Sequence, residues 1–346
     1  MPDFSRVLCA VDLTDPSRRA LDCALWWARQ HGADVSVLHV RHLPPPPADS
    51  AGIAGDVTTP APEPVPVAAP LLTPDQRAER LLELEAFVHD ARTDGLQVEV
   101  LLDEEATVAG AILARADALA ADLIVIGAGT HTTSDHPALG RVSAGVLAGA
   151  PCSVLVVPPP APDVANPCIG GVNRIMCAVS LSQASVHALE CAASLAGQSA
   201  AQLTVVHVVE FFSEVAALAY DFDAHREARL QPACDELVAL VAMVVGRHRP
   251  VEEIVAQGTA SFRISRLAVE ESADLIVVSR GSGAGARAGG RHTGQAVARN
   301  ARCAVLFVHA EAPVPMLDQE PLHGAERRDA PASGAHGLTP QEPRRR

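Results

Sequence analysis

The sequence predicts an α/β fold of two tandem, doubly wound domains, each a Rossmann-like, five-stranded parallel sheet with helices on both faces. Three observations predict it. Short continuous apolar runs alternate with helical stretches, as in parallel sheets whose strands are buried on both sides. The segment that starts at Arg6 reappears in a second copy that starts at Arg174. The 346 residues are enough for two domains and their connecting segments.

The first copy contains five expected strands. These short apolar runs cover residues 7–11, 35–40, 98–102, 123–126 and 153–157. Two of the helices between them have clear start signals, because Thr14 or Asp15 precedes Pro16, and Thr73 precedes Pro74. Hydroxyl and carboxylate side chains accept hydrogen bonds from the first helical amides, and proline is tolerated in the first turn.

The second copy repeats the first at three places. "RVLCAVDLTDPSRRALDC" from Arg6 matches "RIMCAVSLSQASVHALEC" from Arg174, "ADLIVIGAG" from Ala121 matches "ADLIVVSRG" from Ala273, and "APCSVLVV" from Ala150 matches "ARCAVLFV" from Ala301. We therefore expect domain 1 at residues 1–158 with a proline-rich insertion at 43–70, a linker at 159–171, domain 2 at 172–310, and a disordered tail at 311–346.

Charge and composition exclude several function classes. The net charge of −14 opposes binding to nucleic acid or to an anionic membrane, and 3% aromatic residues are too few for base-stacking platforms. All 27 basic residues are arginines, which excludes a Walker A phosphate loop and a Schiff-base lysine. Any anion site must therefore use arginine, backbone N–H groups or helix termini.

The chain shows no sign of export or of membrane insertion. Its start, Met1-Pro2-Asp3, lacks a basic flank and an apolar core, and its apolar runs are shorter than the roughly 20 residues that span a bilayer. The eight cysteines form no C-x-x-C pair and no Cys/His ligand spacing, so we expect reduced, buried thiols without a metal site or a disulfide framework. The expected location is the cytoplasm.

A ligand of such a fold binds outside the carboxyl ends of the strands, where the strand order reverses. Asp12 follows the first expected strand, and Gly127 follows the fourth. Gly140 ends the loop that Gly127 begins and precedes a helix, so backbone N–H groups and a positive helix terminus can approach a phosphate there. Asp12 can accept hydrogen bonds from an adenine amino group or a ribose hydroxyl, and Val40, at the end of the second strand, can present its backbone to a base.

At these residues the chain resembles the universal stress protein family, in its tandem form. The resemblance rests on "VLCAVDLTDPSRRALDCALWWARQHGADVSVLHV", "ADLIVIGAGT" and "LGRVSAGVLAGAPCSVLVV", and it covers both copies. It implies an adenine nucleotide alpha hydrolase-like fold, a stress-linked function, pairing through the last strand, and ATP binding in a subset of members. Those members carry an Asp after strand one, a Val after the His of strand two, and a Gly-x-x-Gly-(nine residues)-Gly-Ser/Thr loop.

Copy one keeps Asp12, Val40, Gly127 and Gly140 at the matching positions and departs at two others. Thr130 replaces the second loop glycine, unless a slip of one residue lets Gly129 serve. Arg141 replaces the Ser/Thr after the last glycine, where a guanidinium can pair with phosphate or block the site. The expected nucleotide-binding set, named in full, is Asp12, Val40, Gly127, Thr130, Gly140, Arg141, Val142 and Ser143.

Copy two departs further from the binding pattern. Ser180 replaces the Asp, Ser279 replaces the first glycine, and Arg291-His292 stand where Gly-Ser is expected. Loss of a charge-assisted contact lowers affinity about 10- to 100-fold, so we expect ATP in domain 1 only. The arginines of the glycine-rich loop at 279–294 either hold an anion or are solvated.

Simpler structural roles compete with these functional ones. His39 and His207 occupy equivalent strand positions, which favours histidines that satisfy the backbone over acid–base catalysts. His131 and His136 are expected to face solvent, and Asp12 has a competing role as a turn cap. We assign no catalytic residue and no metal ligand.

The leading hypothesis is a non-catalytic stress-response protein with a degenerate domain 2 that completes a homodimer or an intramolecular domain pair. The alternative is an interaction module that binds no nucleotide and acts through dimerisation with an unknown protein partner. Slow ATP hydrolysis in domain 1 is a third hypothesis, for which the sequence supplies neither a lysine nor a Mg²⁺-binding carboxylate pair.

Overall fold

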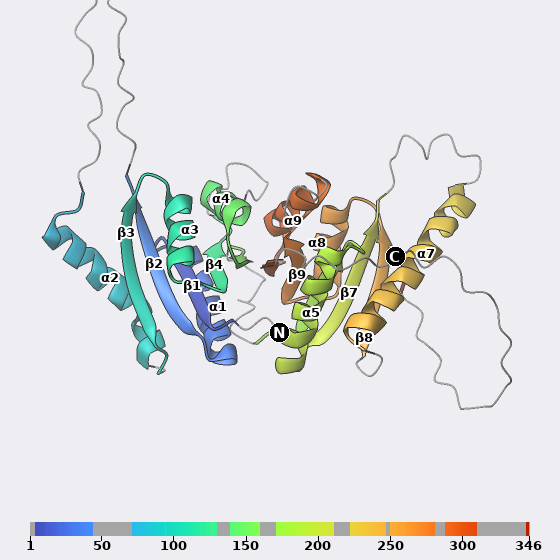
Figure 1. Cartoon of the computed structure of the whole chain (residues 1–346), viewed down its shortest axis with the longest axis horizontal. Helices are drawn as coiled ribbons and strands as arrows, with labels where there is room; N and C mark the ends of the chain where they lie inside the picture. The colour runs from blue at the N-terminus through green and yellow to red at the C-terminus, as the bar shows by residue number, and fades with distance from the viewer. Residues whose placement is uncertain are drawn as a thin grey trace, which may run out of the picture.

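The structure is a computed structural model, shown in Figure 1. It describes residues 4–43, 71–93, 95–129, 139–159, 171–210, 222–246, 250–280, 288–309 and 344–345. Thr130, His131, His136, most of the insertion, of the linker and of the tail, and part of the glycine-rich loop of domain 2 lie outside these ranges. The described residues form a mixed α/β fold in which the chain repeats one arrangement of strands and helices.

Domain 1 contains five parallel strands with helices between them. In chain order its elements are β1 (Arg6–Val11), α1 (Asp15–His31), β2 (Asp34–His42), α2 (Pro74–Thr93), β3 (Val98–Glu105), α3 (Val108–Ala118), β4 (Leu123–Gly127), α4 (Arg141–Gly149) and β5 (Ser153–Val157). The five expected strands are all present, and β2 and β3 run two and three residues beyond the predicted ends at residues 40 and 102.

Domain 2 repeats this order. Its elements are β6 (Arg174–Val179), α5 (Gln183–Gln198), β7 (Gln202–Val209), α7 (Phe222–Val244), β8 (Val251–Gln257), α8 (Ala260–Glu270), β9 (Leu275–Arg280), α9 (Ala288–Asn300) and β10 (Ala304–His309). None of the described helices is long and apolar enough to cross a membrane.

Both domains contribute to one continuous sheet. Its strand order is β11-β8-β7-β6-β9-β10-β5-β4-β1-β2-β3, where β11 (Arg344–Arg345) is a two-residue strand beside β8. Neighbouring strands are parallel except at the joint, where β10 runs antiparallel to β5. There Leu306 pairs with Leu155, its own counterpart in the repeat, and Phe307 and Val305 pair with Val154 and Val156. The register therefore has the self-complementary form of a twofold interface, here between two domains of one chain.

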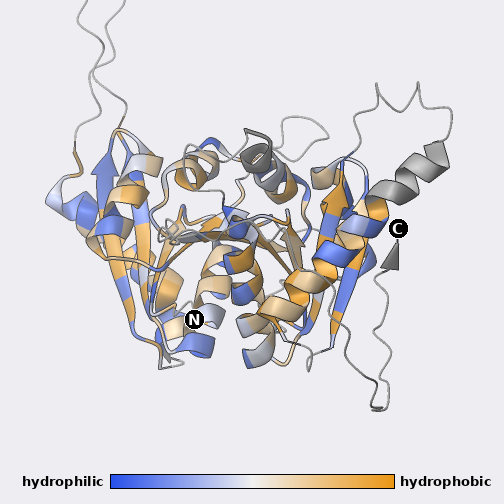
Figure 2. Cartoon of the chain, turned by 45° about the vertical axis from the view of Figure 1, so that its right-hand side comes forward, coloured by the Kyte–Doolittle hydropathy of each residue, from blue (hydrophilic) through white to orange (hydrophobic). Residues whose placement is uncertain are grey.

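Helices cover both faces of this sheet. One core packs α1, α2, α5 and α7 against the strands, and the other packs α3, α4, α8 and α9 against the opposite face. Figure 2 shows hydrophobic residues concentrated in the strands and on the helix sides that face them. Trp27 of α1 is 1% exposed and anchors the first core next to Phe4, whose ring lies 5.0 Å away. This burial on both faces explains the continuous apolar strands.

The helix starts follow the predicted local chemistry. Thr14 is the N-cap of α1, and its N–H donates to the hydroxyl of Ser17 at 3.1 Å. Before α2, the N–H of Thr73 donates to Gln76 Oε1 at 3.0 Å, while the N–H of Gln76 donates to the Thr73 hydroxyl at 3.3 Å. Each pair supplies hydrogen-bond acceptors to backbone amides that have no partner within the helix at its start.

Candidate functional site

The predicted site residues gather at the carboxyl ends of β1 and β4. These strands are parallel neighbours, with Cys9 beside Val125, and β2 pairs with the other side of β1. The helix that follows β1 packs on one face of the sheet, and the helix that follows β4 packs on the other. This arrangement is the topological switch point at which open α/β sheets bind ligands.

Asp12 directly follows β1, and its carboxylate binds the start of α1. Oδ1 accepts a hydrogen bond from the N–H of Thr14 at 3.1 Å and a second from the Thr14 hydroxyl. Burial raises the pKa of Asp12, but hydrogen bonds from the hydroxyls of Thr14 and Ser17 and from backbone amides outweigh it, so the pKa lies below its usual value. Asp12 is thus an anion that caps the turn before α1.

His39 and Val40 lie in β2 beside this turn. His39 Nδ1 is 2.9 Å from the carbonyl oxygen of Val11, the last residue of β1, so the ring satisfies the backbone there. Val40 is partly buried and pairs with Asp103 of β3. The carboxylate of Asp103 accepts a hydrogen bond from Nε of Arg115 in α3 at 3.1 Å, which fixes the β2–β3 end next to Val40.

Two glycines close the base of the loop that follows β4. Gly129 has a φ of +105°, and a Cβ added to it would lie 2.9 Å from Cα of Gly140. The N–H of Gly140 donates to the carbonyl of Ala128 at 2.7 Å. Gly127, by contrast, tolerates a Cβ, whose nearest neighbour would be the carbonyl oxygen of Pro16 at 3.9 Å. The backbone therefore requires glycine at 129, and a Cβ at 140 would lie 3.2 Å from Cα of Gly129. Thr130 lies outside the described residues.

Helix α4 begins at the far side of this loop. Gly140 is its N-cap, and Arg141 and Val142 are exposed in its first turn. Ser143 is buried, and its hydroxyl donates to the carbonyl of Gly127 at 2.7 Å. That hydroxyl ties α4 to the end of β4, while the guanidinium of Arg141 stays at the surface of the predicted phosphate loop.

The matching place in domain 2 has different chemistry. Ser180 stands at the position of Asp12, and its hydroxyl lies 2.9 Å from the hydroxyl of Ser182 and 3.0 Å from that of Ser185. Arg280 ends β9, and its guanidinium contacts His309 Nδ1 at the end of β10. Burial lowers the pKa of Arg280. Hydroxyls bound to one another thus replace the carboxylate.

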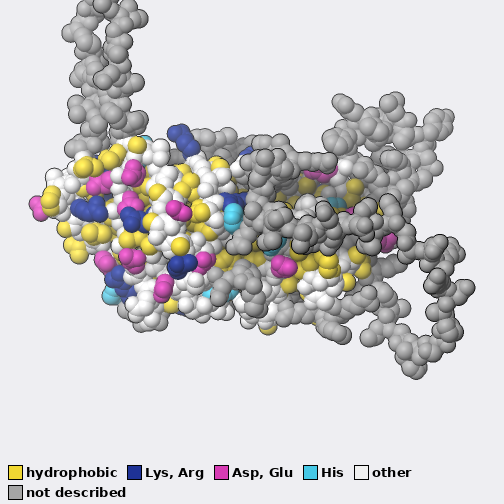
Figure 3. All heavy atoms as spheres, in the orientation of Figure 1, with side chains coloured by type: hydrophobic (Ala, Val, Ile, Leu, Met, Phe, Trp, Pro, Cys, Tyr) yellow, Lys and Arg dark blue, Asp and Glu magenta, His cyan; other side chains and the backbone are white. Residues whose placement is uncertain are grey.

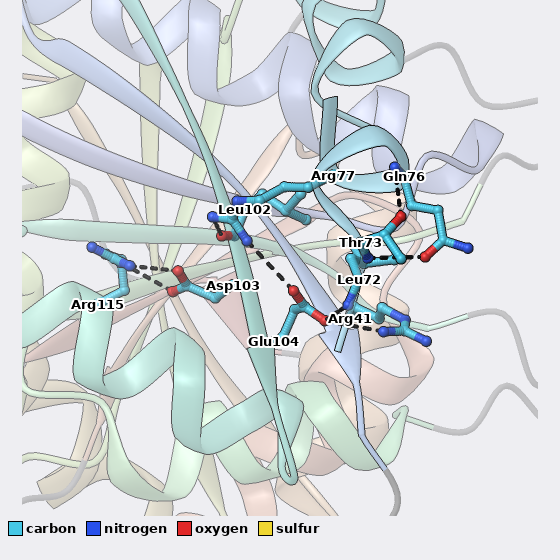
Figure 4. Close-up of polar contacts among 9 residues, drawn as sticks. All are labelled: Arg41, Leu72, Thr73, Gln76, Arg77, Leu102, Asp103, Glu104 and Arg115. Carbon is cyan, nitrogen blue, oxygen red and sulfur yellow. Dashed lines mark hydrogen bonds and ion pairs between the residues drawn. The ribbon is translucent and has the colours of Figure 1, made fainter. Parts of the chain in front are cut away.

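Figure 4 shows a cluster of ion pairs that sequence reasoning missed, at the carboxyl ends of β2 and β3. The side chain of Glu104 is 9% exposed; Oε2 accepts a hydrogen bond from Arg41 at 3.0 Å and one from the N–H of Leu72 at 2.9 Å. Arg77 lies 3.5 Å from Oε1. Glu104 thereby holds together the two described stretches of chain that flank residues 44–70. Elsewhere on domain 1, acidic and basic side chains are interspersed over the face shown in Figure 3.

The cysteines correct one expectation. Among the described residues, six cysteines are buried free thiols, namely Cys9, Cys152, Cys177, Cys191, Cys234 and Cys303. Burial raises the pKa of Cys152 to about 11 and the pKa values of Cys191 and Cys303 to about 12, so these thiols are unreactive at neutral pH. Cys23, however, is disulfide-bonded, so the prediction of reduced cysteines was wrong there. The described residues contain no group of three or more His, Cys, Asp or Glu able to hold a metal.

Comparison with known proteins matches both halves. The profile described as the universal stress protein family matches residues 3–158 and again residues 171–309. A search of curated proteins found no match.

Several solved structures have the same fold. A putative universal stress protein from Pseudomonas aeruginosa is 18% identical, covers 89% of this chain and 94% of its own, and has a TM-score of 0.58. A universal stress protein from Archaeoglobus fulgidus is also 18% identical, with 89% and 98% coverage and a TM-score of 0.58. A third match, a functionally unknown protein from Pseudomonas aeruginosa, has the same identity and TM-score and 93% coverage of its chain. At this identity the likeness establishes the fold.

Proposed function

The chain belongs to the universal stress protein family, and from that premise we propose that it is a non-catalytic, cytoplasmic stress-response protein whose domain 1 binds an adenine nucleotide such as ATP. In this proposal domain 2 is degenerate and binds none, and the β5–β10 joint supplies within one chain the domain pair that the family forms by dimerisation. The six buried free thiols favour a reducing compartment, whereas the disulfide of Cys23 does not.

One observation carries the proposal: the same backbone turn holds an anionic carboxylate in domain 1 and a hydroxyl cluster in domain 2. Asp12 is exposed at the carboxyl end of β1, and β1 lies beside β4, after which the backbones of Gly129 and Gly140 pack closely. A carboxylate there can accept hydrogen bonds from ribose or adenine, and the N-terminus of α4 lies where phosphates would be held. The hydroxyls around Ser180 are already bound to each other.

Calorimetric titration of the full chain with ATP tests this proposal. We expect one binding site per chain. Asp12→Ala should lower ATP affinity 10-fold or more, since charge-assisted hydrogen bonds contribute about 1.5–3 kcal/mol. The matched control Ser180→Ala should leave ATP affinity unchanged. Two equivalent sites, or a site lost in the control instead, would contradict the assignment to domain 1.

No binding by the wild type would favour an interaction module without nucleotide. The observation behind that second candidate is Arg141, exposed in the first turn of α4 where the binding pattern has a small hydroxyl.

A further inference from the structure

The antiparallel joint brings the start of β10 to the edge of the sheet where the strands of domain 1 end. Gly127, the last residue of β4, pairs with Val157 of β5. On the other side of β5, Val156 pairs with Val305 of β10, and β10 begins at Ala304. Continuing this antiparallel register by three residues places Arg302 beside the chain that leaves β5.

The opposite edge of the joint shows directly that such residues meet. There Arg280 ends β9, its guanidinium contacts His309 at the end of β10, and its charge acts on Cys152, just before β5. The N–H of His309 donates to the Ser153 hydroxyl at 3.1 Å. A residue at the carboxyl end of one domain's strands therefore lies against the segment that enters the last strand of the other.

The internal repeat identifies the equivalent positions at the edge of domain 1. Ala128 is the counterpart of Arg280 in the "ADLIVIGAG" repeat, and Cys303 is the counterpart of Cys152 in the "APCSVLVV" repeat. Ala128 and Cys303 therefore occupy the equivalent places at the edge of domain 1. The residue before Cys303 is Arg302, which is exposed and takes the place of Pro151.

Sheet dimensions allow a distance to be set. Two strand spacings of about 4.8 Å separate β4 from β10, and Arg302 lies two residues, at about 3.3 Å each, before the start of β10. In a chain that stayed extended, its Cα would lie roughly 12 Å from that of Gly127. An extended arginine side chain and a triphosphate held at the start of α4 together span such a gap.

We propose that Arg302 of domain 2 binds the phosphates of a nucleotide in domain 1. The inference rests on the proposed function. The chain has no lysine and a net charge of −14, so a triphosphate needs a local cation, and a guanidinium pairs with phosphate through two parallel hydrogen bonds. In this role domain 2, which binds no nucleotide itself, completes the nucleotide site of domain 1 in the same chain.

Titration of full-length Arg302→Gln with ATP and with adenosine tests the proposal. We expect ATP affinity to fall about 10-fold and adenosine affinity to stay the same, because adenosine has no phosphate. Arg302→Lys should recover part of the ATP affinity. The charge-matched control is Arg266→Gln, since Arg266 lies on α8 and pairs with Glu270 at 2.8 Å; it should bind ATP like the wild type.

The outcomes separate this inference from the proposed function. ATP binding by Arg302→Gln at wild-type affinity would overturn the role of Arg302 and leave the nucleotide site of domain 1 standing. An equal loss of ATP and adenosine affinity would also overturn it, because it would indicate a disturbed fold. A wild type that binds neither compound would overturn the proposed function and, with it, this inference.

Discussion

The switch points of domain 1 and domain 2 have the same backbone and opposite side-chain chemistry. Leu13 and its counterpart Leu181 both adopt the left-handed region, with φ of 63° and 53°, which is costly for a residue other than glycine. His207 repeats the bond of His39, with Nδ1 2.9 Å from the carbonyl oxygen of Val179. A strained turn present in both domains, with the carboxylate in only one, shows that the turn can form without the carboxylate.

The largest difference between the domains should come from the disulfide of domain 1. Cys23 in α1 is disulfide-bonded, whereas its counterpart Cys191 in α5 is a buried free thiol. A reductant should lower the free energy of unfolding of domain 1 by about 3 kcal/mol, since a disulfide restricts the unfolded chain. Urea unfolding with and without reductant measures this. Cys23→Ala should be insensitive to the reductant and Cys191→Ala as sensitive as the wild type; the reverse pattern would contradict the asymmetry.

A smaller effect should mark the loop of domain 1. Gly129→Ala should cost about 1–3 kcal/mol, because its φ is +105° and the new Cβ would lie 2.9 Å from Gly140. Gly127→Ala is the control, since its Cβ would find its nearest neighbour at 3.9 Å, and it should change stability by less than about 1 kcal/mol. Thermal unfolding compares the two variants. Equal costs would contradict the requirement for glycine at position 129.

The smallest effect concerns the charge of Asp12. Its folded pKa lies below the unfolded value of about 3.9, so its stabilising contribution is present above about pH 4 and is lost as the pH falls through the folded pKa. Because the group is half exposed, we expect Asp12→Asn to lower stability at pH 6 by less than about 1 kcal/mol, with a smaller difference at pH 3. Ser180→Ala should show no such pH dependence. A gap between wild type and Asp12→Asn that widens on acidification would contradict this sign.

Part of the site could be predicted from sequence because its signals are local. The Asp12 turn, the Thr14 cap and the glycines that flank the loop after β4 follow from residues within a few positions of each other. The choice between Gly129 and Thr130 could not be made that way. It depends on the approach of Gly140 across the base of a loop, which only the folded backbone sets.

The ion pairs around Glu104 show the same limit. Arg41 and Glu104 are 63 residues apart in sequence, and their charges have no pattern that distinguishes them from solvated ones. Their contact depends on the parallel pairing of β2 and β3, which places Arg41 beside Glu104.

The sequence by itself determined the duplication, the order of strands and helices, and the helix starts, because apolar runs and capping groups act over a few residues. Tertiary structure decided how the two copies join. The apolar runs of β5 and β10 would by themselves suit many registers, and the structure pairs Leu155 with Leu306. The two faces of this sheet are buried by helices of both domains, so the pairing depends on segments far apart in the sequence.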